Sequence, residues 1–203
     1  MSDIFLRTEM LIGKEALLRL KSKHIMLFGL GGVGSACGEA LVRAGIGKLS
    51  IIDNDVVAEH NINRQIIASL SSVGMLKTEA FEKRCLDIND ELKIIKYPIF
   101  FNEENLDKIN FEGVDYIIDA IDTISSKLCL AKYAFNKAIP IISCMGTGNR
   151  LHPELFAFAK LEDTSYCPLC KVMRKLCKSE GIEGLEVLFS KEQLESAEKS
   201  RTP

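Results

Sequence analysis

A glycine-rich segment between an apolar run and a helix is the feature that most limits what this chain can form. Residues Gly29–Gly34 read G-x-G-x-x-G. They follow His24–Phe28, a run typical of a buried strand, and open a helix predicted over Gly32–Ala44. Such a loop lets the backbone approach a phosphate, which then lies at the positive end of the helix. The alternative is a turn that only packs helix on strand. The glycines predicted to bind nucleotide are Gly29, Gly31, Gly32 and Gly34.

Short apolar runs alternate with amphipathic segments along the next hundred residues. Further strands are predicted at Leu49–Ile52, Lys93–Tyr97, Tyr116–Asp119 and Pro140–Ser143, and further helices at Lys77–Asn89 and Thr123–Asn136. This alternation indicates an α/β fold with a doubly wound, mostly parallel sheet of the Rossmann-like type.

The rhythm changes after Gly148. We expect strands at Leu155–Leu161 and Leu185–Phe189 and a short basic helix at Cys167–Lys178, so that a C-terminal extension adds one or two strands. The predicted organisation is one domain over residues 1–190, with a nucleotide-binding half over about 20–148 and a substrate-side half over about 149–190. Residues 191–203 form a polar tail.

Composition excludes several classes of protein. The 203 residues are 47% apolar and carry a net charge of −2, which excludes a disordered or fibrous chain and disfavours a non-specific nucleic-acid binder. We find neither a secretory signal nor an apolar run of the 18 or so residues that a membrane span needs. Seven cysteines, an odd number, are most simply reduced thiols. We therefore expect a cytoplasmic protein.

Polar residues after the second strand indicate that the protein binds a nucleotide and that it cleaves a phosphate bond of that nucleotide. Asp53 closes that strand, where a carboxylate can bind ribose hydroxyls of either NAD or ATP. Asn61, Arg64 and Gln65 would share one side of a helix, and Lys77 follows at a helix start. Two cations beside the phosphates suit an enzyme that cleaves ATP, because charge builds up on the leaving pyrophosphate. The alternative is that Arg64 and Lys77 are solvated surface residues.

Carboxylates also end the fourth strand. Asp119, Asp122 and Thr123 lie at its carboxyl end, where open α/β sheets bind ligands. A carboxylate there can hold Mg²⁺ together with substrate phosphates. Asp122 can equally be the N-cap of the next helix, and both roles can coexist.

Taken together, these motifs resemble the ubiquitin-activating-type adenylating family, which includes the molybdopterin-synthase and thiamine-biosynthesis (ThiF-type) adenylyltransferases. The shared pattern is G-x-G-G-x-G, D-x-D (Asp53, Asp55), N-x-x-R-Q (Asn61, Arg64, Gln65), V-G-x-x-K (Lys77) and D-x-x-D (Asp119, Asp122). The resemblance implies that Asp53 holds the ribose, that Asn61, Arg64 and Lys77 contact phosphates, and that Asp122 binds Mg²⁺ or orients ATP. It implies attack of a carboxylate on the α-phosphate, with pyrophosphate as leaving group.

Several further stretches are similar to the tRNA threonylcarbamoyladenosine dehydratase branch of that family. They are RTEMLIGKEALLRLK near the N-terminus, MGTGN at Met145–Asn149 and VLFSKE at Val187–Glu192. The branch adenylates the threonylcarbamoyl carboxylate on a tRNA adenosine and closes the group to a cyclic form with loss of AMP. Members commonly continue into an apolar C-terminal segment, whereas this chain ends in a polar tail at Pro203. Truncation and membrane association are therefore left open.

Three partner predictions follow from the resemblance. An N-terminal arginine, matched by Arg7, reaches across a two-fold homodimer to the partner's triphosphate; from spacing alone it is a surface arginine. A sulfur-relay protein is a further partner. Basic residues of the Cys167–Lys178 segment would contact tRNA phosphates, although a solvated helix face explains them equally; they are Lys171, Arg174, Lys175 and Lys178.

Two other functions and the cysteines are left open. One alternative is an adenylyltransferase that activates the C-terminal glycine of a small sulfur-carrier protein, and another is a non-catalytic NAD-binding or nucleotide-sensing domain. Cys167 and Cys170 form a lone C-x-x-C pair, followed only by Cys177. Structural zinc, incidental core thiols and a redox or sulfur-handling role are the three explanations.

Overall fold

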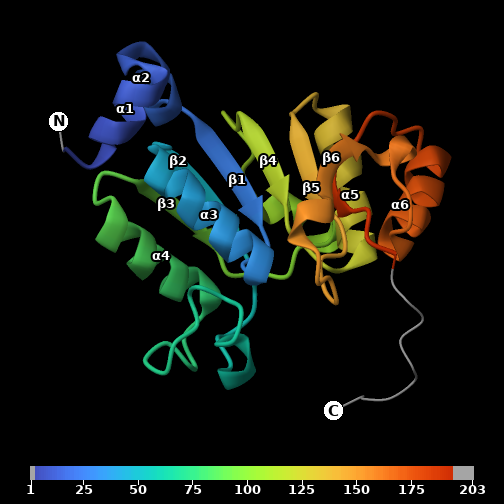
Figure 1. The fold of residues 1–203 in the computed structure, drawn as a ribbon, viewed down its shortest axis with the longest axis horizontal. Helices are drawn as coiled ribbons and strands as arrows, with labels where there is room; N and C mark the ends of the chain where they lie inside the picture. The colour runs from blue at the N-terminus through green and yellow to red at the C-terminus, as the bar shows by residue number, and fades with distance from the viewer. Residues whose placement is uncertain (1–2, 194–203) are drawn as a thin grey trace.

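One seven-stranded sheet organises residues 3–193, which are the residues that the computed structural model describes. The strand order is β3-β2-β1-β4-β5-β7-β6, and every neighbouring pair is parallel except β6 and β7 (Figure 1). The predicted doubly wound sheet and its C-terminal strands are confirmed. The strands are β1 His24–Phe28, β2 Lys48–Ile52, β3 Lys93–Tyr97, β4 Tyr116–Asp119, β5 Ile141–Cys144, β6 Phe156–Lys160 and β7 Glu186–Ser190.

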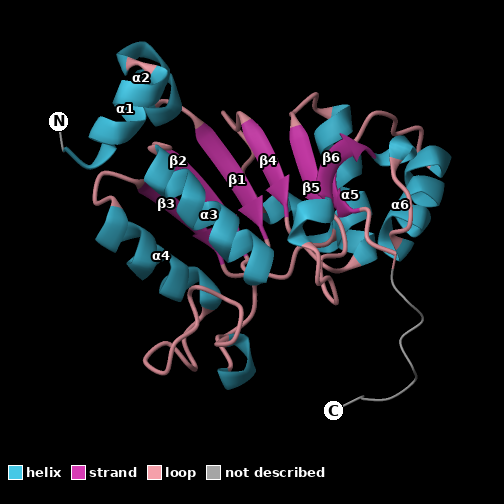
Figure 2. Cartoon of the chain, in the orientation of Figure 1, coloured by secondary structure: helices cyan, strands magenta, loops and turns pink. Residues whose placement is uncertain are grey.

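Helices cover the sheet on its two faces, as Figure 2 shows. The α-helices are α1 Leu6–Ile12, α2 Lys14–Lys21, α3 Gly32–Ala44, α4 Lys77–Ile88, α5 Ile124–Asn136 and α6 Pro168–Ser179. Short 3-10 helices lie at Asp3–Phe5, Glu59–Asn61, Glu103–Lys108, Pro153–Leu155 and Leu161–Asp163. The predicted α-helices begin and end within one residue of these bounds, whereas α1 and α2 are additional to the prediction. None of the helices within residues 3–193 is long and apolar enough to cross a membrane.

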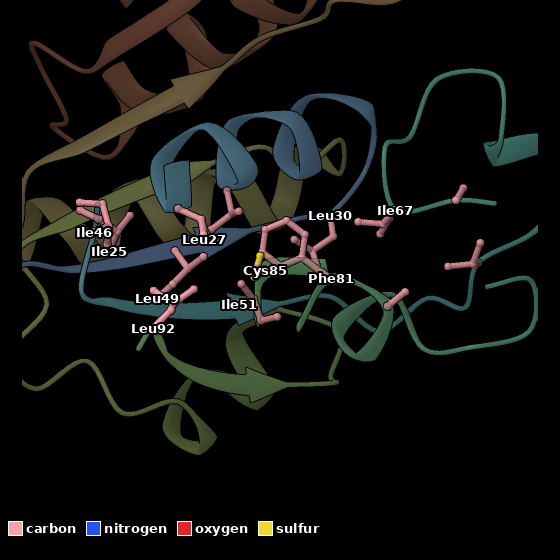
Figure 3. Close-up of a cluster of buried hydrophobic side chains, with 14 residues drawn as sticks. Ile25, Leu27, Leu30, Ile46, Leu49, Ile51, Ile67, Phe81, Cys85 and Leu92 are labelled. Atoms are coloured by element: carbon pink, nitrogen blue, oxygen red, sulfur yellow. The ribbon is translucent and has the colours of Figure 1, made fainter. Parts of the chain in front are cut away.

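The central strand β1 is buried along its whole length, as its continuous apolar sequence predicts. Its side chains alternate between two cores because successive residues of a strand point to opposite faces. Ile25 and Leu27 join the cluster beneath α3 and α4, shown in Figure 3, while Met26 and Phe28 join the cluster on the other face, with residues of α5. A third cluster joins α6 to β7. The site is therefore built on a strand that is clamped from both sides.

Three strands end at the same level beside the point where the sheet changes direction. Phe28 pairs with Ile52 of β2 and with Asp119 of β4. β1 and β4 are neighbours although β2 and β3 intervene in the chain, so the connections from these two strands leave to opposite sides. Open α/β sheets bind ligands in the crevice at such a switch point. The loops after β1, β2 and β4 must therefore meet there.

A buried ion pair ties α5 to the sheet below this crevice. Lys127 Nζ donates to Asp119 Oδ2 at 2.9 Å and to Ser143 Oγ at 3.1 Å. The side chains of Lys127 and Asp119 are 0% and 1% exposed. Asp119 Oδ1 also accepts from the N–H of Ile121 at 3.0 Å. Asp119 thus organises the turn that follows β4 and is satisfied from inside the protein.

Breaking this pair from one side should be more damaging than removing both charges. Lys127→Met leaves the Asp119 carboxylate buried without its cation, so we expect the free energy of unfolding to fall by about 3–5 kcal/mol. The double variant Lys127→Met/Asp119→Asn should regain a large part of that loss, because no buried charge remains. Urea unfolding followed by circular dichroism measures both. Equal stabilities of the single and double variants would contradict the assignment.

Candidate active site

A cavity of about 810 Å³ lies at the carboxyl ends of β1, β2 and β4. Its walls come from the glycine loop, the segment after β2, the residues after β3 and β4, and the loop after β5. The sequence-predicted residues that line it are Gly29, Gly31, Gly32, Asp53, Asp55, Asn61, Arg64, Gln65, Lys77, Asp122 and Thr123. Residues as distant in sequence as Gly29 and Thr123 therefore share one surface.

The glycine loop uses its glycines in two different ways. Gly29 has φ of 87°, and a Cβ there would lie 2.7 Å from the carbonyl oxygen of Ala120. A Cβ on Gly34 would lie 1.8 Å from the carbonyl oxygen of Gly29. Gly34 is buried in the first turn of α3 and does not line the cavity, so it packs the helix against the loop. Gly31 has no atom within 4 Å of a built Cβ and faces open space.

Asp53 is held in place by two backbone N–H groups. Its Oδ2 accepts from Leu30 at 2.7 Å and its Oδ1 from Asp55 at 2.8 Å. Burial raises the pKa of Asp53, while these two hydrogen bonds and the charge of Lys77 oppose that rise. Each carboxylate oxygen keeps a further lone pair for a ligand hydroxyl. The side chain is thus a fixed acceptor at the end of β2.

Lys77 is a buried cation whose ammonium group reaches the cavity. Its Nζ donates to Asp55 Oδ2 at 2.6 Å, and its side chain is 7% exposed, against 58% for Asp55. The backbone joins the two residues as well, since the N–H of Lys77 donates to the carbonyl of Asp55 at 2.9 Å. A lysine ammonium has three donors, so two remain for an anionic ligand.

Asn61, Arg64 and Gln65 come together without the α-helix considered from their spacing. A 3-10 helix ends at Asn61, and turns follow. Asn61 Oδ1 accepts from the N–H of Ala58 at 3.0 Å, which fixes the buried side chain. Arg64 is exposed, and its aliphatic part lies 3.7 Å from a Cβ built on Gly32. The buried Gln65 Oε1 has no hydrogen-bond partner among residues 3–193, so this oxygen can accept from a ligand.

The two aspartates after β4 occupy different environments. Asp119 is buried on Lys127 and does not line the cavity, so the structure does not bring it to the ligand side as the prediction of cofactor binding requires. Asp122 is exposed to the cavity. The N-cap of α5 is Thr123 rather than Asp122, which corrects the capping alternative. Asp122 accepts one weak hydrogen bond, from the Thr123 hydroxyl at 3.4 Å.

The remaining predicted residues lie outside this cavity. Arg7 is exposed on α1. On α6, Arg174 donates to the Thr164 carbonyl at 2.9 Å and so is partly engaged within the protein. The other three cations of that helix are exposed: Lys171, Lys175 and Lys178. None of the four cations of α6 has an ion pair among those found in residues 3–193.

Sequence reasoning missed an apolar wall and several polar groups. The apolar wall is formed by Phe28, Ile52, Ile99, Phe100 and Phe101. The missed polar or small residues are Asn54, His60, Ser126, Thr147 and Gly148. The residues at positions 99–101 follow β3, as Asp53 follows β2, but their apolar side chains give no signal in the sequence that marks a ligand site.

The three cysteines on and beside α6 lie in an apolar cluster. Cys167, Cys170 and Cys177 are all buried in the cluster beneath α6. Within residues 3–193 no group of three or more His, Cys, Asp or Glu side chains is arranged to hold a metal ion.

Comparison with known proteins assigns the family. The model of the ThiF family matches residues 5–185. The chain belongs to the ThiF family. A relative in this family, the tRNA threonylcarbamoyladenosine dehydratase of Bacillus subtilis, is 42% identical over 189 residues, which are 93% of this chain and 74% of the relative. The Escherichia coli enzyme of the same name is 35% identical over 195 residues, covering 92% of this chain and 73% of the relative.

A solved structure extends this ThiF-family likeness to three dimensions. The Escherichia coli tRNA N6-threonylcarbamoyladenosine dehydratase, TcdA, in complex with ATP superposes with a TM-score of 0.91 at 34% identity. The match covers 96% of this chain and 84% of that chain. The sheet and its surrounding helices are therefore shared almost throughout.

Because the loop glycines have two different roles, the same added methyl group should destabilise the protein at one position and have almost no effect at the other. Gly34→Ala would place Cβ against backbone, so we expect a loss of at least about 3 kcal/mol and a melting temperature lower by roughly 6–12 °C. Gly31→Ala meets open space and should change the melting temperature by no more than about 2 °C. Differential scanning fluorimetry compares them. Similar melting temperatures for both variants would show that the loop is packed differently.

Proposed function

We propose that this protein is an ATP-dependent dehydratase that adenylates the threonylcarbamoyl carboxylate of a modified tRNA adenosine and then cyclises it. The observation that carries the proposal is the meeting of three groups in one cavity: the glycine loop, the cations Lys77 and Arg64, and the Asp122 carboxylate. An NAD-binding domain needs no such cations, because no phosphate bond breaks. The dehydratases that are 42% and 35% identical to the chain support the choice of substrate.

Different walls of the cavity suit different parts of an ATP molecule. The apolar residues Ile99 and Phe100 are at least partly exposed in the cavity and offer a surface for the adenine ring. Asp53 lines the same cavity and accepts from ribose hydroxyls. The backbone of Gly31 and Gly32 opens toward the phosphates at the start of α3. ATP bound in this order directs its triphosphate toward Arg64 and Lys77.

Mg²⁺ suits the residues present. The ion takes oxygen ligands and is commonly held by one or two carboxylates together with substrate phosphates. Asp122 is exposed to the cavity and its carboxylate is engaged only weakly, by Thr123. Asp122 would hold the ion, which would supply positive charge to the phosphates. Asp119 is unsuited to this role, because Lys127 and Ser143 already occupy it.

Activation is a substitution at the α-phosphorus. A carboxylate oxygen of the threonylcarbamoyl group forms a bond to that phosphorus, and the bond to the bridging oxygen of pyrophosphate breaks. Lys77 and Arg64 stabilise the charge that accumulates on the pyrophosphate, an effect worth about 10²-fold or more per group in similar settings. In the second step the group closes on its own activated carbonyl carbon and AMP leaves with the former carboxylate oxygen. The two steps remove the elements of one water molecule.

The exposed cations of α6 are the proposed contact for the tRNA backbone. Lys171, Lys175 and Lys178 are exposed, and α6 packs against the part of the sheet beyond β5. Contacts of this kind neutralise phosphates and carry no base preference. The division into a nucleotide-binding and a substrate-side half, the cytoplasmic location and the sulfur-relay partner stay predictions.

We expect the purified protein, given ATP, Mg²⁺ and tRNA carrying threonylcarbamoyladenosine, to release AMP and a nucleoside lighter by one water. Lys77→Ala and Asp122→Ala should each lower turnover by about 10²-fold or more, because each removes charge stabilisation from the transition state. Lys83→Ala is the matched control, since Lys83 is exposed on the same helix as Lys77. Liquid chromatography with mass spectrometry of digested tRNA gives the readout.

Two results would contradict this function. One is AMP release that depends on a glycine-ended sulfur-carrier protein and not on the modified tRNA. The other is near-normal turnover of Lys77→Ala or Asp122→Ala at saturating ATP and Mg²⁺.

The enzyme should work as a homodimer in which Arg7 completes the partner's site. Two exposed apolar patches favour a second copy of the chain, since monomers seldom expose large apolar surfaces. The first is on and beside α1 and includes Met10 at 69% and Leu11 at 85% exposure; the second is in the segment after β2 and includes Leu70 at 87%. A two-fold contact would bury the same surface on each chain.

Mixing two inactive variants tests the shared site. Arg7→Ala and Lys77→Ala should each be inactive alone, whereas a heterodimer has one site with both groups intact. Random exchange in an equal mixture should restore about a quarter of the wild-type rate, because half of the dimers are mixed and each has one complete site. Arg19→Ala, an exposed arginine on α2, is the control and should retain activity. If native mass spectrometry confirms mixed dimers and the mixture stays inactive, Arg7 does not complete the partner's site and is a surface residue.

A further inference from the structure

Two cysteines at the start of α6 lie outside the roles described so far. Cys167 is the N-cap of the helix, Pro168 is its first residue and Cys170 is in its first turn. Cys167 is 2% exposed and Cys170 is fully buried. Both thiols are reduced in the structure. A cysteine at the N-cap followed by another three residues later is the arrangement in which thiols at helix N-termini become reactive.

The Cys167 sulfur is surrounded by hydrogen-bond donors. The Cys170 thiol donates to it, and so do the backbone N–H groups of Cys170, Gly146 and Leu169. These bonds lower the pKa of Cys167 to about 5, against the opposing effect of burial. The hydrogen bond between the Cys170 and Cys167 side chains, together with burial, raises the pKa of Cys170. The pKa of Cys167 is thus lowered and that of Cys170 raised, so Cys167 is the sulfur of the pair that more readily becomes a thiolate.

Three other cysteines, two of them buried and one partly buried, differ in this respect. Burial raises the pKa of Cys85 to about 12 and that of Cys144 and Cys177 to about 11. Because the thiolate is the nucleophile, these three sulfurs are inert at neutral pH. Cys177 lies on the same helix and in the same apolar cluster, so it is a matched comparison.

The reactive sulfur also touches the loop that closes one side of the cavity. A Cβ built on Gly146 would lie 4.0 Å from the Cys167 sulfur. The next two residues, Thr147 and Gly148, line the cavity. On the other side of Gly146, the N–H of Met145 donates to the Leu188 carbonyl at 2.9 Å. Gly146 thus lies beside Cys167 and Leu169, and Met145 packs in the apolar cluster that contains Cys167 and Cys170, so the cavity loop and the start of α6 are in contact here.

We propose that Cys167 and Cys170 form a reversible dithiol–disulfide pair, oxidised by a small hydroperoxide, that controls the position of the cavity loop. Because both sulfurs are buried, the oxidant in this proposal is a molecule as small as hydrogen peroxide and not another protein. The part that concerns nucleotide binding rests on the proposed function.

The chemistry balances with peroxide as the oxidant. The Cys167 thiolate attacks one peroxide oxygen, the O–O bond breaks, and hydroxide leaves to give a sulfenic acid. The Cys170 sulfur then attacks the Cys167 sulfur, the S–O bond breaks, and water leaves with the Cys170 proton. Two electrons pass from the two sulfurs to the peroxide oxygens. The products are a disulfide, one water molecule and one hydroxide ion, and the hydroxide becomes a second water by taking a proton from solvent. A small dithiol reverses the change by thiol–disulfide exchange.

The order of the two cysteines follows from their surroundings. Cys170 stays protonated while it faces a thiolate, so it does not compete for the peroxide. Once Cys167 is a neutral sulfenic acid, the negative charge that favoured the Cys170 thiol is gone. Cys170 can then lose its proton more easily and attack the Cys167 sulfur in the second step. Disulfide formation also removes the charged acceptor of the Gly146 N–H, which weakens the attachment of the loop.

Peptide mapping of the full chain tests the pair. The reduced protein is exposed to hydrogen peroxide, unfolded, alkylated with N-ethylmaleimide and digested. We expect the peptide containing positions 167 and 170 to lose two hydrogens and to escape alkylation, and a small dithiol to restore it. In Cys170→Ser, dimedone should trap a sulfenic acid on Cys167. Cys177→Ser should behave like the wild type.

Nucleotide binding gives the second readout. Binding of a fluorescent ATP analogue should weaken by about tenfold on oxidation of the wild type, the effect of losing one hydrogen bond to a charged group. It should be insensitive to peroxide in Cys167→Ser. Full alkylation of both cysteines after peroxide treatment that oxidises the unfolded chain would overturn the pair. A disulfide that leaves ATP affinity unchanged would overturn its control of the loop. A disulfide in a protein that binds ATP in neither state would instead count against the proposed function.

Discussion

Backbone contact between the glycine loop and the segment after β4 is the constraint on which the cavity depends. Gly29 approaches Ala120 so closely that no side chain fits between them, and Gly34 approaches Gly29 in the same way. These contacts leave the N-terminal end of α3 facing the residues that follow β4. The loop after β2 is joined to the same point, because Asp53 accepts from the N–H of Leu30. Main-chain contacts and the Asp53 carboxylate thus hold three strand ends together before any ligand arrives.

Charged groups around this point divide into those that hold the protein and those that face the cavity. Asp119 and Lys127 satisfy each other out of reach of solvent, whereas Lys77 is buried along its stem and pairs with the exposed Asp55. An anion that enters the cavity can share Lys77 without leaving a bare carboxylate in the core, because Asp55 is in contact with water. Burial of one partner and exposure of the other therefore gives a cation that is fixed in place and still available.

The sequence predicted most of what depends on strand ends and less of what depends on packing. The glycine loop, Asp53 and Asp122 follow from their positions after strands, and the structure places them around one cavity. Gly34 and Asp119 belong to the same motifs, but spacing does not reveal whether a residue faces the ligand or the interior. The segment from Asn61 to Gln65 brings its side chains together through a 3-10 helix and turns. Helical periodicity therefore predicted correctly that these side chains lie together, but it predicted the wrong backbone conformation. The apolar wall at positions 99–101 was missed because apolar residues after a strand look like any other core.

The position of β7 has a consequence for how the chain is made. Within residues 3–193 it is the strand that comes last in the sequence, yet it lies between β5 and β6 in the sheet. Until residues 186–190 leave the ribosome, β5 has an unpaired outer edge and β6 has no neighbour. Val187 and Phe189 also complete the apolar cluster beneath α6, so that helix has an incomplete core during the same interval. Strands β1 to β5 can pair during translation, while β6 must wait for β7. An exposed strand edge in that interval is a point at which nascent chains can associate.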